Sequence, residues 1–134
     1  MRNVQMKLLK PLTVRQRNIG KALLEHIRKT GNTITYKALG NAVGLVTPDE
    51  IHYVVGNEIG EVSKYCYRLG LPLISVMVVS GDTMMCGKGF RGLCDELEIC
   101  QDMKDDMELQ CIWTKRVLEC KDWSKLEALL NGEI

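Results

Sequence analysis

Apolar residues between positions 14 and 30 recur three to four residues apart, which places them on one face of a helix. Thr13 and Gln16 have the spacing of a capping box, in which each side chain accepts a hydrogen bond from a backbone amide of the first turn. Gly31 follows the last apolar position and is placed to end the helix. The pattern therefore predicts a helix over 14–30.

Two more helices are predicted before residue 70. Thr35 is a suitable cap for a short helix over 36–43, and Gly44 allows a sharp turn after it. Thr47 followed by Pro48 is a strong helix start, and the apolar pattern continues from there to residue 68. A short helix, a glycine turn and a capped helix in this order are typical of a helix-turn-helix.

The second half of the chain begins with its longest apolar segment, residues 73–79, which is broken only by Ser75 and predicts a buried strand. A turn at Ser80-Gly81-Asp82 and a return arm over 84–90 would complete a β-hairpin. We also expect a helix over 103–119. The predicted fold class is α+β, with a helix-turn-helix or winged-helix-like three-helix core, a β-hairpin and C-terminal helices.

The 134 residues suit a single domain over 1–134, with a basic helical part (1–70) and a part holding the hairpin and acidic C-terminal helices (71–134). No apolar run approaches the ~20 residues of a membrane span. No apolar stretch follows the basic residues near the N-terminus, so we expect no secretory signal and a cytoplasmic location.

The net charge of +1 hides a strong asymmetry. Residues 1–46 hold nine Lys or Arg and one acid, whereas residues 47–134 hold nine Lys or Arg and sixteen acids. One interpretation is a basic face that meets phosphates and an acidic face that does not. The other is that the two halves attract each other within the fold.

Catalytic and metal-binding patterns are missing from the sequence. The six cysteines lack the short spacings of a zinc knuckle, so we expect free thiols, no bound metal and no cofactor. His26 falls on the buried side of the first helix, and His52 has no nucleophile beside it in the sequence. We therefore expect a protein that is not an enzyme.

Three segments, residues 34–40, 54–56 and 71–79, resemble the DNA-binding domain of alkyltransferase-like proteins. They share its order of a threonine-tyrosine helix start, a recognition helix and a buried strand after a Leu-Pro pair. Alkyltransferases carry a Pro-Cys-His-Arg core in this strand, and this chain has Ser75-Val76-Met77 there. The resemblance thus implies DNA binding without the transfer chemistry.

Scattered motifs also resemble a small uncharacterised domain of phage and bacterial proteins that is associated with restriction-type endonucleases. The motifs are Tyr65-Cys66, Gly70-Leu71-Pro72-Leu73, Val78-Val79, Gly87-Lys88-Gly89-Phe90 and Asp122-Trp123. This resemblance implies a role near DNA or in host defence.

The leading functional hypothesis is a non-catalytic module that binds DNA or RNA mainly through phosphate contacts, within a phage or bacterial defence-related system. Carboxylates on the third helix weaken it, because they repel the phosphates that flank a groove. The candidate phosphate contacts are Arg15, Arg17, Lys21, Arg28, Lys29, Lys37, Lys88 and Arg91. The candidate base readers are His52, Tyr53 and Asn57.

The alternative hypothesis is a protein-binding inhibitor of a host nuclease, of anti-CRISPR or antirestriction type. Its acidic surface would occupy the nucleic-acid channel of the partner as a phosphate mimic, although the same acids also suit a plain solvent-facing helix. The candidate residues are Asp95, Glu96, Glu98, Asp102, Asp105, Asp106 and Glu108.

Overall fold

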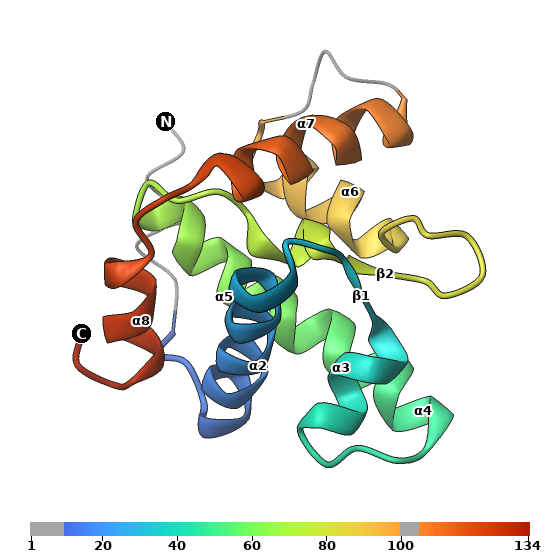
Figure 1. Cartoon of the computed structure of the whole chain (residues 1–134), viewed down its shortest axis with the longest axis horizontal. Coiled ribbons are helices and arrows are strands. Elements are labelled where there is room, and N and C mark those ends of the chain that lie inside the picture. Colours follow the sequence, from blue (N-terminus) through green and yellow to red (C-terminus); the bar gives the residue numbers. More distant parts are fainter. Residues whose placement is uncertain (1–9, 100–104) are drawn as a thin grey trace.

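The computed structural model of the chain describes residues 10–99 and 105–134. Helices surround a very short two-stranded sheet, which makes the fold helix-rich α+β (Figure 1). The first helix, α2 (Val14–Thr30), has the predicted bounds. The amide of Thr13 donates to the side chain of Gln16 at 2.9 Å, and the amide of Gln16 donates to the hydroxyl of Thr13 at 3.1 Å. The predicted capping box is therefore confirmed.

The next two predicted helices are also confirmed. Thr35 accepts a hydrogen bond from the amide of Ala38 and caps α3 (Tyr36–Ala42). After the turn at Gly44, three segments follow one another without a break: α4 (Pro48–Glu50), η1 (Ile51–Val55) and α5 (Gly56–Arg68). The middle segment η1 is a wider π-helical turn, a feature frequent at functional sites and one that the sequence pattern does not predict.

The predicted strand over 73–79 is mostly wrong. Residues Ile74–Met77 form the 3-10 helix η2, and only β2 (Val78–Val79) is extended. One reason is that the amide of Ser75 donates to the hydroxyl of Ser63 on α5, at 2.9 Å, so it is not available to a sheet. The strand β2 pairs in parallel with β1 (Ile34–Thr35), with Ile34 opposite Val78.

The predicted β-hairpin is also wrong. Residues 80–86 form a turn and an irregular segment, and residues Lys88–Glu96 form the helix α6. The sequence holds the reason, because Phe90, Leu93, Cys94 and Leu97 recur at helical spacing and all four are buried. Burial of these four side chains on one helical face outweighs the hairpin that the glycines on either side of Lys88 suggest.

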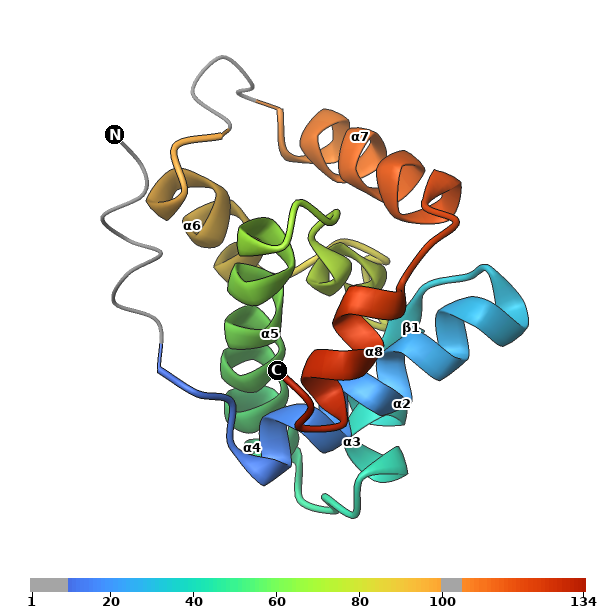
Figure 2. The same ribbon diagram turned by 90° about the vertical axis from the view of Figure 1, so that its left-hand side faces the viewer.

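Two helices complete the chain, α7 (Asp106–Glu119) and α8 (Ser124–Leu130). The helix α7 begins later than predicted, because the side chain of Asp105 accepts a hydrogen bond from the amide of Met107 and caps it. Asp102 lies outside the described residues. The helix α8 packs against α2, whereas α7 packs against η2 along the upper edge of the molecule (Figure 2).

The core contains one buried polar pair. The hydroxyl of Ser63 donates to the hydroxyl of Ser75 at 2.7 Å, and Ser63 in turn accepts the amide of Ser75. Both residues are buried among apolar side chains, so each needs the other as a partner. The pair fixes η2 to α5.

Two further findings concern the described residues as a whole. No helix among them is long and apolar enough to cross a membrane. None of the five cysteines in this part of the chain is in a disulfide.

Candidate nucleic-acid interface

A cleft of about 1120 Å³ lies between α3, the η1–α5 helix and the segment that follows β2. All three predicted base readers, His52, Tyr53 and Asn57, line it together with the predicted phosphate contact Lys37. Residues from five separate parts of the chain form its walls, so no single motif marks it in the sequence. The other polar and aromatic residues that line it are Thr35, Tyr36, Ser75, Ser80, Asp82 and Phe90.

Tyr36 joins two walls of the cleft. Its hydroxyl accepts a hydrogen bond from the amide of Gly87 at 3.1 Å, which ties the start of α3 to the start of α6. A Cβ added to Gly87 would lie 2.9 Å from the hydroxyl oxygen of Tyr36, so the close approach depends on glycine. Burial raises the pKa of the Tyr36 hydroxyl above its usual value, so this group stays neutral at physiological pH.

The wall on the π-helical turn carries the exposed aromatic side chains. The ring of Tyr53 is 68% exposed, and it meets the ring of His52 edge to face with centroids 5.4 Å apart. Asn57, one turn further along, is exposed as well. The π-helical turn lies close to α3 at Gly40. A Cβ added to Gly40 would lie 2.8 Å from the side chain of Ile51, so this close approach needs glycine.

The cleft is nearly neutral, which the charge of the first 46 residues does not suggest. Among its lining side chains that the structure describes, Lys37 is the cation and Asp82 the anion. Asp49 and Glu50 are exposed at the start of the same helix wall, and Glu50 accepts a hydrogen bond from the hydroxyl of Thr47. The cleft thus offers aromatic and apolar surface rather than a phosphate site.

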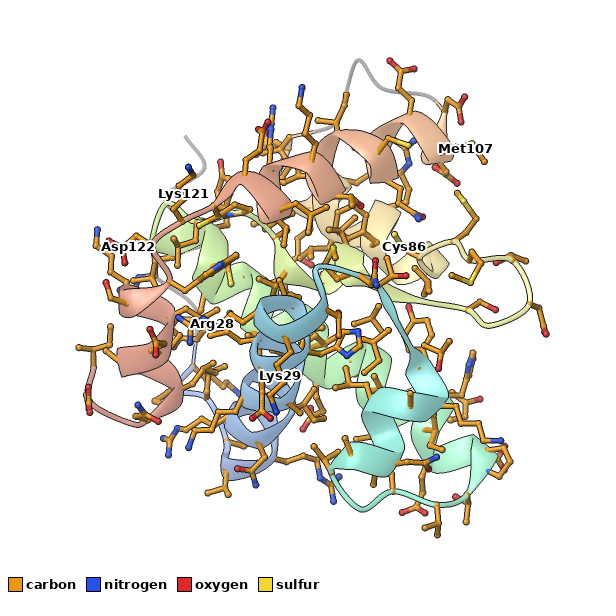
Figure 3. The ribbon with its side chains drawn as sticks, in the orientation of Figure 1. Arg28, Lys29, Cys86, Met107, Lys121 and Asp122 are labelled. Atoms are coloured by element: carbon orange, nitrogen blue, oxygen red, sulfur yellow. The ribbon has the colours of Figure 1, made fainter. Side chains whose placement is uncertain are left out.

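The cations of α2 form a second, separate group. Arg28 and Lys29 are already in ion pairs, with Glu127 on α8 and with Glu25, each at 2.7 Å (Figure 3). Arg15, Arg17 and Lys21 make no ion pair with a described residue, and Arg15 and Lys21 are exposed. Only the second set is therefore open for phosphates without breaking an existing contact.

Direct ion pairs between the basic and acidic halves of the chain are few in the described ranges. Arg28–Glu127 is the one ion pair that joins residues 1–46 to residues 47–134 within the described ranges. It raises the pKa of the Arg28 guanidinium, since the hydrogen bond to Glu127 favours the charged form. Most of the charge asymmetry therefore remains at the surface.

The two predicted contacts on the supposed hairpin lie on α6 instead. Arg91 pairs with Asp106 on α7, its Nε 2.8 Å from the carboxylate, and its side chain is mostly buried. Lys88 is at the start of α6, and its side chain lies outside the described part of the structure. Arg91 is thus a link between α6 and α7 rather than an open phosphate contact.

The acidic candidates do not form one continuous surface. Glu96 pairs with Lys64, Asp106 pairs with Arg91, and Asp105 caps α7. Glu98 and Glu108 are exposed; Glu98 lies in the turn after α6, and Glu108 lies in α7. At least three of the described acids therefore have structural partners, which reduces what the segment can offer as a phosphate mimic.

Two of the described thiols and His26 are held in packed surroundings. Burial raises the pKa of the Cys86 thiol to about 12, and the thiol donates to the side-chain oxygen of Gln110 at 3.0 Å. Burial likewise raises the pKa of Cys66 to about 12. His26 lies against the carbonyl of Thr33 at 3.0 Å, as expected for a packed residue. In the described ranges, no three His, Cys, Asp or Glu side chains gather as a metal site.

No family model, no curated protein and no solved structure matches this chain. The arrangement of the cleft is therefore the main guide to function.

Several cleft residues were not among the sequence candidates. The cleft that His52 lines is also lined by Tyr36, Ser80, Asp82 and Phe90. These residues come together because β2 pairs with β1 and α6 packs on α5. The one hint in the sequence is the group of glycines between 81 and 89, which permits close approach of backbone and side chains.

Proposed function

We propose that the protein is a non-catalytic nucleic-acid-binding module that belongs to a phage or bacterial defence-related system. The observation that carries this proposal is the meeting of His52, Tyr53 and Asn57 with Lys37 along one cleft. The order of α3, a glycine turn and a capped second helix supports a helix-turn-helix interpretation. The defence context rests on the sequence resemblances alone.

The charges support a division of roles. The exposed cations Arg15 and Lys21 on α2 and Lys37 at the cleft have no ion-pair partner among the described residues. Such cations bind phosphates without sequence preference and give salt-dependent affinity. The cleft, with its aromatic and amide side chains, is suited to contact bases.

The test is fluorescence anisotropy with labelled DNA and RNA oligonucleotides, single-stranded and duplex, at roughly 50 mM salt. We expect binding that weakens as salt rises. With Arg15, Arg17, Lys21 and Lys37 as contacts, the log–log salt slope should be about −3 on a single strand. No measurable affinity for any of the four ligands would refute the proposal.

A further inference from the structure

We propose that the cleft binds an unpaired base, so that the preferred ligand is a single-stranded nucleic acid rather than a duplex. This inference rests on the proposed nucleic-acid binding and names the form of the ligand. It follows from the shape of the cleft, its charge and the position of Tyr53.

The composition of the cleft matches a base better than it matches a phosphate. A base is flat, aromatic and uncharged, and the cleft offers the rings of Tyr36, Tyr53 and Phe90 with a few polar groups. Lys37 and Asp82 together leave it without net charge, so a phosphate inside the cleft would gain little. The phosphates are therefore expected outside, on the exposed cations.

The walls of the cleft oppose a duplex. In a helix-turn-helix complex, the first residues of the recognition helix enter the major groove, flanked by two rows of phosphates. Here those first residues are Asp49 and Glu50, both exposed carboxylates. The residues expected to read bases lie on the wall of a cleft that the segment 80–82 also lines. A base reaches such a position only when it is not stacked inside a duplex.

Tyr53 is placed to stack on that base. Its ring is largely exposed, and its edge-to-face contact with His52 limits its freedom before any ligand binds. Stacking on an exposed aromatic ring is the usual way in which proteins hold single strands, because every base has a flat face.

The experiment compares three DNA ligands of about 12 nucleotides in anisotropy titrations: a single strand, the same strand with its central bases removed, and the matching duplex. We expect the intact single strand to bind roughly tenfold tighter than the strand with abasic sites. We also expect it to bind tighter than the duplex.

Protein variants test the stacking residue. Tyr53→Ala should weaken single-strand binding roughly 5- to 100-fold, whereas Tyr53→Phe should keep most of it because the ring remains. The control is Tyr67→Phe, which alters a tyrosine that lines a different surface pocket beside Trp113. Circular dichroism of each variant confirms that it is folded.

The outcomes separate this inference from the proposed function. Equal or tighter binding of the duplex, or no difference between the intact and abasic strands, would overturn the single-strand inference while nucleic-acid binding stands. Failure of these DNA ligands and of the RNA oligonucleotides to bind would remove both. A folded Tyr53→Ala variant with unchanged affinity would also overturn the inference.

Discussion

The cleft and the outer surface of α2 hold the two groups of candidate contacts, and they are built in different ways. The cations of α2 lie on one helix whose start and end are set by neighbouring residues, Thr13 with Gln16 and Gly31. The cleft is assembled from the start of α3, the π-helical turn, η2 and the segment from β2 to α6. A local feature of the sequence can therefore supply charge, whereas a recess for a base needs several packed elements.

This difference has a consequence for specificity. Exposed cations attract any phosphate backbone, and their strength depends on salt more than on position. The cleft brings Tyr36, Tyr53 and Asn57 onto one concave surface, so it can distinguish one ligand from another. Changes on α2 should thus affect the overall, salt-dependent affinity, and changes in the cleft should affect the preference between ligands.

The largest effect is expected from the surface of α2. Replacing Arg15, Arg17 and Lys21 together by Glu should weaken nucleic-acid binding more than roughly 100-fold at low salt, because attraction becomes repulsion. The control replaces Lys115, Lys121 and Lys125 by Glu, which changes the net charge equally at exposed positions of the C-terminal part of the chain. Similar losses in both variants would show that only net charge matters.

The next effect tests the buried pair of Ser63 and Ser75, of which Ser75 lines the cleft. Ser63→Ala should lower the free energy of unfolding by about 1–3 kcal/mol, because the buried amide and hydroxyl of Ser75 both lose their partner. Ser75→Ala should cost less, since its backbone amide still donates to Ser63. Urea unfolding of the two variants checks the order, and a larger loss for Ser75→Ala would contradict this account.

A smaller effect is expected where α3 meets the π-helical turn. Gly40→Ala should destabilise the protein by about 1–2 kcal/mol, because the new Cβ would lie 2.8 Å from the stiff side chain of Ile51. The control is Gly60→Ala, because no atom lies within 4 Å of a Cβ added there. The higher helix propensity of alanine should increase the stability of this variant by up to about 1 kcal/mol. Thermal unfolding should move the two midpoints in opposite directions.

The smallest effect is expected at the start of α2. Thr13→Ala removes the acceptor of the Gln16 amide and should cost about 1 kcal/mol, with Thr13→Ser close to the wild type. Single-strand affinity should change little, because the cleft does not depend on this cap. A strong loss of affinity without unfolding would show that the two regions are coupled.

Local signals in the sequence determined the helices of the first half. Thr13, Thr35 and Thr47 cap their helices as predicted, because a hydroxyl and an amide a few residues apart interact wherever the rest of the chain lies. The same holds for the surplus of cations in the first 46 residues, which depends only on composition.

Tertiary packing decided the region from residue 73 to residue 97. A run of apolar residues that is buried on every side has no periodicity that distinguishes a strand from a 3-10 helix. Here the hydroxyl of Ser63 accepts the amide of Ser75, which favours the 3-10 helix. Residues 88–96 have apolar positions at helical spacing, and packing of α6 against α5 selects that helix in place of the return arm of a hairpin. The cleft follows from these two choices, because the residues that face each other across it are far apart in the sequence and meet only when their elements pack.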